Sequence, residues 1–381
     1  MLEIGKVYLE HTPHQTRLCA DISMNGRGTT LWFGVAPEQG AYLCHERSDA
    51  FVMALLPTAM RGGHDICFRT PMSLRLHYQL QQYLIPTLSS VGELYRPMSV
   101  RGPLTDEPVE NRGAVATGFS GGVDSLYTIM THGAESAYPL THLVNFHAGV
   151  YDGLGGRKGF LKACSAAQRF ADEIGLEFVA VDTNLSTALP ERYLDVYSFR
   201  NLSCAMALQN LFSVYLLSDG RGAANFSFDL HNSDSYDLLT VSCAQTETMA
   251  VHLSGIQLRR RDKLEALSRW EPSYRWLHPC TAGLVGERNC GRCRKCTRDQ
   301  VTLYALNALD AYGPVFDPAD FRKRLPQSMG FLMAYRKSAQ CRQTVDLLRE
   351  RGIPIPPAAY IYEKQFLIAM ENMEKQKRSE E

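Results

Sequence analysis

The loop 120–125, Ser-Gly-Gly-Val-Asp-Ser, brings two hydroxyls, two glycines and one carboxylate together within six residues. Glycine lets the backbone curl so that several N–H groups can face one anion, and the serine hydroxyls add further donors. A carboxylate beside a phosphate is repulsive unless a cation bridges them, and Mg²⁺ accepts this mixed set of oxygen ligands. The loop therefore predicts a magnesium–nucleotide site formed by Ser120, Gly121, Gly122, Val123, Asp124 and Ser125. Its pattern is neither G-x-x-x-x-G-K-[ST] nor G-x-G-x-x-G.

Four closely spaced cysteines form a second candidate site. They follow the pattern C-x9-C-x2-C-x2-C and are Cys280, Cys290, Cys293 and Cys296. Four thiolates at this spacing suit tetrahedral Zn²⁺ with no open coordination position, which predicts a structural site. The alternatives are cysteines without a metal and an iron–sulfur cluster, because C-x2-C-x2-C also begins a ferredoxin-type ligand run. No C-x3-C-P pattern follows, and this favours zinc.

Three further polar residues are candidates for ligand binding. Arg200 lies where a helix is predicted to begin, and a cation there is unfavourable to the helix dipole unless an anion is near. We therefore expect Arg200 to contact a phosphate or carboxylate in a catalytic role, with a surface salt bridge as the alternative. Asn201 is either a helix cap or a residue that reads the edge of a base. Asp237 is either a ligand for a guanine-like edge or a metal, or an ordinary turn carboxylate.

A basic run, Arg259-Arg-Arg-Asp-Lys263, leads into a predicted helix. It is either a solvated helix face or a group of cations that binds nucleotide phosphates. Three histidines near strand or loop ends are interpreted as structural, namely His147, His231 and His278.

Alternating strands and helices must position these residues. Apolar runs predict strands at 114–118, 142–146, 178–182 and 223–228, and helical patterns cover 125–132, 157–174 and 202–217. Strand and helix in turn predict a parallel sheet with right-handed crossovers. In such a sheet ligands collect at the carboxyl ends of the strands, where the next helix begins. The loop 120–125 lies at such a junction.

Three regions are predicted along the chain. Residues 1–105 show short alternating runs and then a helical pattern over 74–85, which predicts a small α+β accessory or docking domain. A polar linker with two prolines follows, and residues 114–310 are the predicted α/β domain with the four cysteines. Residues 311–381 are a predicted helical extension.

The composition limits the partners. Lysine plus arginine and aspartate plus glutamate both number 40, so the chain lacks the basic excess of proteins that bind bulk nucleic acid. The first residues lack the pattern of a secretory signal, and no apolar run approaches the ~20 residues of a membrane span. We therefore expect a cytoplasmic protein without a membrane partner. Whether it forms a homodimer stays open at this stage.

The loop 120–125 after an apolar strand resembles the S-G-G-x-D-S loop of the PP-loop ATP pyrophosphatases, which cleave ATP between the α and β phosphates and adenylate a substrate oxygen. Together with the cysteines it is similar to the 7-cyano-7-deazaguanine synthase family of queuosine biosynthesis. Residues 199–202 resemble that family's P-x-R-N segment, and residues 234–237 resemble its D-x-x-x-Y-P-D-C segment without the P-D-C triplet. His147-Ala-Gly-Val stands where the family has a Y-G-Q-type segment. The resemblance covers residues 114–310.

This resemblance implies a fold, a reaction and cofactors. The fold is α/β, a parallel-sheet PP-loop (HUP-like) domain with a zinc knuckle, preceded by the small α+β domain. In that family a carboxylate on a 7-deazaguanine is adenylated with ATP and Mg²⁺, attacked by ammonia to give an amide, and activated again to lose water. By residue, the loop 120–125 would hold pyrophosphate and magnesium, and the four cysteines would hold structural zinc. Enlarged relatives in bacterial defence gene sets are thought to act on a macromolecule, so the acceptor here is ammonia, a protein or a nucleic acid.

Two other functions remain open at this stage. One is modification of a tRNA base by another type of PP-loop enzyme, against which the balanced charge argues. The other is a module that binds a nucleotide or deazapurine without turnover. Neither a covalent serine or cysteine nucleophile nor a glutaminase segment is evident, so ammonia or an amine must come from solution or from a co-encoded partner.

Overall fold

A computed structural model describes residues 1–24 and 26–380, with side chains described up to residue 376. The chain forms two compact units. Unit 1 contains Met1–Phe119 and Thr131–Ile256, and unit 2 contains Ser120–Met130 and Gln257–Glu381. Strands on both sides of the predicted boundary near residue 110 belong to one sheet, and the predicted domain boundaries there and near residue 310 stay predictions.

Unit 1 is built on a ten-stranded sheet. Its strands are β1 (Leu2–His11), β2 (Thr16–Met24), β3 (Arg27–Val35), β4 (Ile66–Phe68), β6 (Val100–Arg101), β8 (Ala114–Gly118), β9 (His142–His147), β10 (Glu177–Thr183), β11 (Phe212–Ser218) and β12 (Ala250–Ser254). Two short strands, β5 (Met72–Ser73) and β7 (Leu104–Thr105), pair separately. The order in the large sheet is β12-β11-β8-β9-β10-β3-β2-β1-β4-β6.

The five strands from β8 to β12 are mutually parallel, as the alternation of strands and helices predicts. Strand β3 joins this part by pairing antiparallel with β10, and β1 to β3 form an antiparallel meander. The large, mostly parallel sheet confirms the α/β class. The strands of the predicted N-terminal domain therefore extend the main sheet.

The fourth parallel strand differs from the prediction. The prediction placed a helix over 202–217 and a strand over 223–228, whereas helix α7 ends at Met206 and the strand is β11. Residues Ala223–Asn225 form a 3₁₀ turn. A strand covered on both faces is apolar at nearly every position, so its periodicity cannot separate it from a buried helix.

The strand order contains a topological switch point. Strand β8 lies between β9 and β11, so the chain runs to one side through β9 and β10 and returns to the other side through β11. In open α/β sheets, ligands bind outside the carboxyl ends of the strands at such a point. The loop 120–125 directly follows β8 in the sequence.

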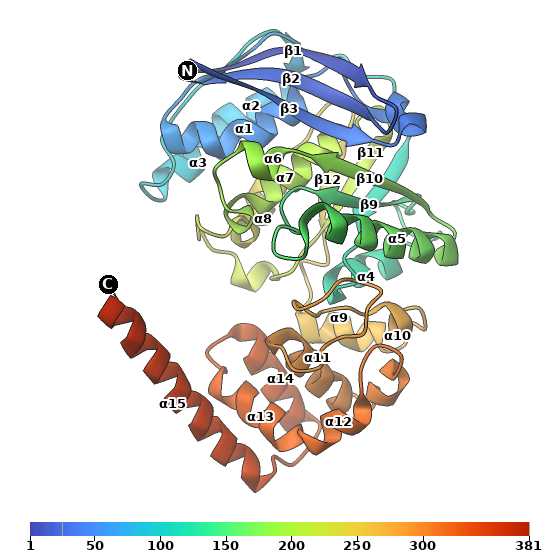
Figure 1. Ribbon diagram of the computed structural model, residues 1–381, viewed down its shortest axis with the longest axis vertical. Coiled ribbons are helices and arrows are strands. Elements are labelled where there is room, and N and C mark those ends of the chain that lie inside the picture. The colour runs from blue at the N-terminus through green and yellow to red at the C-terminus, as the bar shows by residue number, and fades with distance from the viewer. Residues whose placement is uncertain (25, 381) are drawn as a thin grey trace. The chain divides into compact units, whose positions relative to one another are not determined.

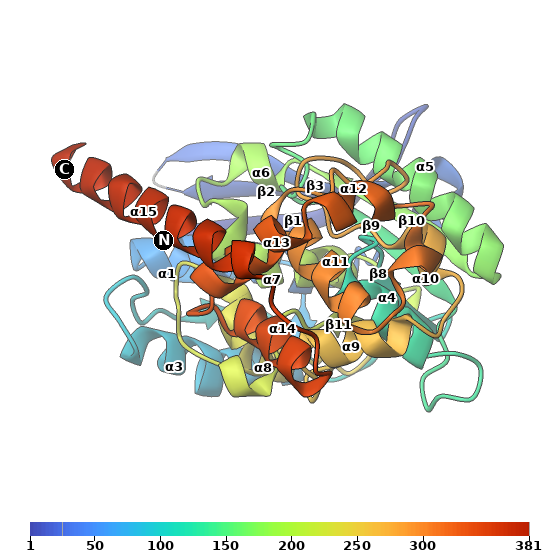
Figure 2. The same ribbon diagram turned by 90° about the horizontal axis from the view of Figure 1, so that it is seen from below.

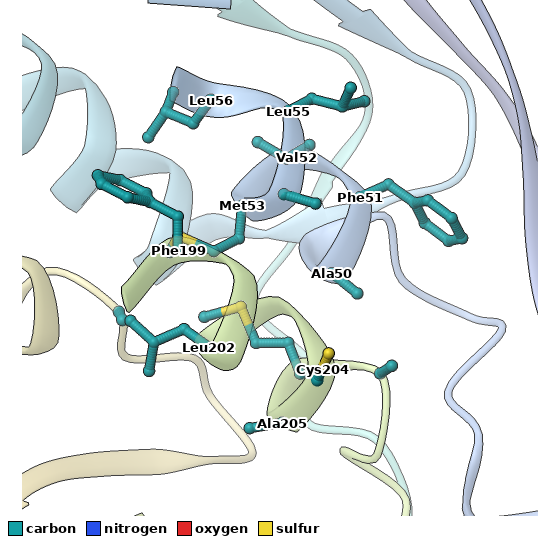
Figure 3. Packing of buried hydrophobic residues seen from close by; sticks show 14 of the residues in the cluster. Ala50, Phe51, Val52, Met53, Leu55, Leu56, Phe199, Leu202, Cys204 and Ala205 are labelled. Carbon is teal, nitrogen blue, oxygen red and sulfur yellow. The ribbon is translucent and has the colours of Figure 1, made fainter. Parts of the chain in front are cut away.

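Helices cover the sheet of unit 1. They are α1 (Asp49–Gly62), α2 (Leu74–Gln79), α3 (Ile85–Ser90), α5 (Gly156–Ile174), α6 (Leu185–Ala188), α7 (Tyr193–Met206) and α8 (Asp237–Ser242). Helix α1 is buried at every position from Asp49 to Met60 and packs on α7, where Met53, Phe199 and Leu202 lie close together (Figure 3). Full burial of one such side chain stabilises the fold by roughly 1.5–3 kcal/mol.

Unit 2 is helical. Its helices are α4 (Val123–Thr131), α9 (Arg260–Leu267), α10 (Ser273–Trp276), α11 (Arg294–Ala305), α12 (Pro318–Lys323), α13 (Leu325–Ala334), α14 (Ala339–Glu350) and α15 (Pro357–Glu380). The long helix α15 packs along α13 (Figures 1 and 2), and Gly330 permits the close approach because a Cβ there would lie 2.5 Å from the carbonyl oxygen of Ala359. Among the described residues, no helix combines the length and apolar character that crossing a membrane requires.

Candidate functional site

The loop 120–125 forms a tight turn before helix α4. Gly121 has a φ of 69°, in the left-handed region that favours glycine, and its carbonyl oxygen accepts a hydrogen bond of 2.7 Å from the backbone N–H of His278. A Cβ at Gly121 would lie 2.7 Å from Val285 Cγ2 and 2.9 Å from the carbonyl oxygen of Trp276. Only glycine fits this position without displacing the segment that precedes the cysteines.

The two serine hydroxyls of the loop meet each other. Ser120 Oγ and Ser125 Oγ are 3.0 Å apart, and the N–H of Gly122 donates to Ser120 Oγ at 3.2 Å. Ser125 Oγ donates to the carbonyl oxygen of Gly122 at 3.1 Å. The turn therefore brings the two hydroxyls and the N–H of Gly122 together in one small hydrogen-bonded cluster, and its binding of a phosphate stays a prediction.

Asp124 is held by two cations. Its carboxylate accepts from Arg260 at 2.5 Å and from Lys263 at 3.3 Å. Arg260 also donates to Asp299 at 3.0 Å, and Asp299 accepts from Arg298 at 3.0 Å. Three cations thus face two carboxylates in this network beside the loop. Of the two interpretations of the basic run, partial burial excludes a solvated face for Arg260 and Lys263.

The charges in this network stabilise one another. Burial opposes the charge of Arg260, but the carboxylates of Asp299 and Asp124 more than offset it and raise the pKa of the guanidinium. Burial likewise opposes the charge of Asp299, and Arg260 and Arg298 overcome it and lower the pKa of that carboxyl. Arg260 and Asp299 are therefore both charged at neutral pH. Sequence reasoning did not connect Arg298 and Asp299 with Asp124, because no local pattern joins residues so far apart in the chain.

The other two arginines of the basic run form salt bridges that stabilise the helices. Arg259 pairs with Asp262 at 2.8 Å in the first turn of α9. Arg261 donates to Glu350 of α14 at 3.0 Å. These contacts are structural, so only part of the run lies at the loop.

The four cysteines come together as their spacing predicts. Their sulfur atoms all lie within 4.8 Å of one another, so the cluster can hold a metal ion. Backbone N–H groups donate to three of the sulfurs: Ala282 and Cys290 to Cys280 at 3.4 Å, Cys293 to Cys290 at 3.3 Å, and Cys296 to Cys293 at 3.5 Å. Such donors stabilise thiolates, the form in which cysteine binds metals.

The electrostatics of one cysteine support this description. Burial opposes a thiolate at Cys293, but the N–H groups of Cys296 and Thr281 donate to its sulfur and lower the pKa of Cys293 to about 6. The Cys293 sulfur also caps the N-terminus of α11 by accepting from Cys296. Four sulfurs this close together can hold a metal ion such as zinc, whose structural sites are closed and tetrahedral.

Arg200 and Asn201 lie in unit 1. Helix α7 contains a non-helical residue, Val196, so Arg200 lies in the first turn after this break rather than at the start of α7. The buried Arg200 donates to the backbone carbonyls of Ala148 and Glu191, at 3.2 and 2.8 Å. Asn201 donates to the carbonyl oxygen of Tyr197 at 2.8 Å and does not cap the helix. A ligand contact for either residue stays a prediction.

Asp237 begins helix α8 and is buried. It accepts a short hydrogen bond from the hydroxyl of Ser198 on α7. Burial raises the pKa of Asp237 to about 8, and the nearby carboxylates of Asp234 and Asp219 act in the same direction. Among the described residues no other group pairs with this carboxyl, so it is not an ordinary exposed turn residue.

The predicted residues thus fall into two sets. The loop 120–125 and the cysteines belong to unit 2, whereas Arg200, Asn201 and Asp237 belong to unit 1. Within unit 2, Trp276 and His278, which contact Gly121, lie just before Cys280 in the sequence.

No model of a known protein family matches the chain, and no curated protein sequence matches it.

Proposed function

We propose that the protein is an ATP-dependent carbon–nitrogen ligase. A carboxylate oxygen attacks the α phosphorus of ATP, pyrophosphate leaves, and the resulting acyl adenylate reacts with ammonia or an amine to give an amide and AMP. A carboxylate and an amine form only a salt without such activation. Resemblance in the loop and the cysteines favours a 7-deazaguanine-type carboxylate, which could go on to a nitrile or a conjugate in a defence function.

The observation that carries this proposal is the loop with its cations. Ser120 and Ser125 place their hydroxyls 3.0 Å apart at the start of a helix that directly follows a strand at the switch point of the sheet. Arg260 and Lys263, both paired with Asp124, add positive charge beside the loop. Pyrophosphate is a highly charged leaving group, so donors and cations that are already in place stabilise its departure.

Magnesium and zinc have different roles in this proposal. Mg²⁺ would enter with ATP and be held by Asp124, which would then exchange its contacts with Arg260 and Lys263 for the metal, and the two cations would contact phosphate oxygens. Zinc would remain in the cysteine cluster, where it holds the segment that follows His278. Since that segment contacts Gly121, the metal site would support the loop without taking part in the reaction.

Exchange of labelled pyrophosphate into ATP tests the proposal. Purified protein, Mg²⁺-ATP and 7-carboxy-7-deazaguanine are expected to support exchange, because adenylation is reversible. Asp124→Ala combined with Ser125→Ala should reduce exchange by about 100-fold or more, as loss of oriented transition-state groups does. Matched controls, Asp106→Ala and Ser165→Ala, change exposed residues in unit 1 and should leave exchange unchanged. Exchange that survives the double substitution would overturn the assignment of the loop.

The ion pairs of Asp124 favour a second candidate, a module that binds a nucleotide without turnover. If Asp124 stays paired with Arg260 and Lys263 when ATP binds, it cannot serve as a magnesium ligand. Calorimetry with Mg²⁺-ATP and with metal-free ATP separates the two. Binding that is independent of Mg²⁺, with no pyrophosphate exchange for any carboxylate or amine supplied, would favour the module.

A further inference from the structure

The long helix α15 of unit 2 packs on its neighbour α13 through one face. Phe366 lies edge-on to Phe331 of α13, with ring centroids 5.4 Å apart. One turn from the start of α15, the buried Ala359 lies against Gly330 of α13. Ala359 and Phe366 are seven residues apart in the sequence, so both lie on the same side of the helix. This side of α15 holds it against the rest of unit 2.

The opposite side of α15 exposes large apolar side chains. Tyr360, Ile361, Leu367 and Ile368 are 55, 62, 41 and 48% exposed. Two adjacent apolar residues thus recur after seven positions, which places all four in one stripe along two turns of the helix. The C-terminal half of α15 extends beyond the other helices of unit 2 (Figures 1 and 2). An apolar stripe among polar residues is typical of an interaction surface.

Two opposite charges lie within this stripe. Lys364 follows the first apolar pair by one turn and Glu371 follows the second by one turn. Both side chains are exposed, and among the described residues neither forms an ion pair. They are two turns apart, about 10 Å along the helix axis, which is too far for them to pair with each other. Each can therefore pair with a charge on another molecule.

We propose that α15 pairs with the α15 of a second copy of the chain, antiparallel about a twofold axis. An axis placed between Leu367 and Ile368 sets Leu367 level with Ile368 of the second copy. The same axis sets Lys364 level with Glu371 of the second copy, because these two residues are also placed symmetrically about it. The symmetry repeats each contact, so the helix pair gains two apolar contacts and two ion pairs.

The charges favour this orientation over a parallel one. In a parallel pair in register each residue lies beside its own copy, so Lys364 would meet Lys364 and Glu371 would meet Glu371. Such contacts between like charges oppose association, whereas the antiparallel arrangement brings opposite charges together. Polar residues within an apolar helix seam specify register in the same way. The stripe is therefore complementary to itself, which identifies a second copy as its partner.

The length of the stripe limits the strength of this dimer. Residues 360–375 extend over about 22 Å of helix. A single pair of helices of this length buries less than the roughly 1,600 Å² of a standard protein interface. We therefore expect a weak dimer that exchanges with the monomer at micromolar concentrations. Single side chains can shift such an equilibrium measurably in either direction.

Exchange of the two charges tests the arrangement. Sedimentation velocity of the full chain over a micromolar range of concentrations should show monomer and dimer in equilibrium. Lys364→Glu should raise the dissociation constant by about tenfold or more, because it creates two contacts between like charges. Glu371→Lys should do the same. In the double variant the charges are exchanged, so the dissociation constant should return to within about threefold of the wild type.

Apolar substitutions provide a matched comparison. Leu367→Ser combined with Ile368→Ser should abolish the dimer. Met373→Ser should leave it intact, because Met373 is 58% exposed but lies on the same side of α15 as Phe366. Circular dichroism and thermal unfolding of each variant check that the helix is kept.

Each outcome decides the matter. A chain that stays monomeric throughout this range would overturn the proposal, as would hydrogen-exchange protection of residues 360–371 that does not rise with protein concentration. A dimer that survives the two serine substitutions would have its interface elsewhere. A dimer that the charge exchange fails to restore would have another register, and either result would also overturn the proposal. Pyrophosphate exchange tests the proposed function independently of all these results.

Discussion

Asp237 illustrates how burial can set the properties of a single residue. A carboxyl whose pKa rises on folding binds more protons in the native than in the unfolded state, so its contribution to stability falls as the pH rises. With the pKa of Asp237 raised to about 8, this loss should develop between pH 4 and pH 8. Below pH 4 both states are protonated, and the cost disappears.

Asp237→Asn should remove this loss. Asn cannot ionise and can keep a hydrogen bond with Ser198, so the variant should become more stable than the wild type as the pH rises, by on the order of 3 kcal/mol at pH 7. Urea unfolding at pH 5 and pH 8 measures the difference. Asp106→Asn, at an exposed position, should show no such trend. A gain that is the same at both pH values would contradict the assignment.

Arg260 should carry more stability than an exposed arginine. Arg260→Met leaves the carboxylates of Asp124 and Asp299 without their shared partner in a largely buried place, which should cost about 3 kcal/mol. Adding Asp299→Asn should recover part of this loss, because one uncompensated charge is removed. Arg269→Met is the matched control, since Arg269 lies just after α9, its side chain is exposed, and its pair with Glu265 contributes little. Additive effects of the two buried substitutions would show that the network is not coupled.

At the scale of elements, the turn before α4 depends on Gly121. Gly121→Ala introduces a Cβ into a left-handed conformation and within 3 Å of Val285 and Trp276. The conformational strain alone costs on the order of 1 kcal/mol, and the contact adds to it. We expect lower stability of unit 2 and weaker Mg²⁺-ATP binding. Gly133→Ala is the control, because its Cβ meets nothing within 4 Å and its φ is not positive. Equal effects of both substitutions would contradict the role of the turn.

At the scale of the whole molecule, the cysteine cluster should affect the stability of unit 2 more than that of unit 1. Purified protein should contain about one zinc per chain, because four thiolates form a single closed site. Chelation should increase hydrogen exchange in residues 257–376 well before it does so in unit 1, since metal-binding energy is folding energy for the segment it organises. Cys290→Ser should lose the metal and Cys67→Ser should keep it. Uniform deprotection of both units, or iron in place of zinc, would contradict this assignment.

A feature can be predicted from the sequence when the residues that form it lie close together in the chain. The turn at Gly121 and the cysteine cluster were predictable because the residues that form each of them lie close together in the chain. The same holds for strands β8, β9 and β10, whose apolar runs end at turn residues. Strand β11 was mistaken for part of a helix, since a strand covered on both faces has no alternation that distinguishes it.

The sequence by itself determined that the backbone can turn at Gly121, that four cysteines can share a metal ion, and that strands alternate with helices. These features follow from local sterics and spacing. Only the tertiary structure decided that Asp124 pairs with Arg260 and Lys263, that Arg200 bonds to backbone carbonyls, and that His147 faces Asp182. These contacts join residues far apart in the chain. They depend on strand register and helix packing, which arise from the collective burial of many apolar side chains and not from any local pattern.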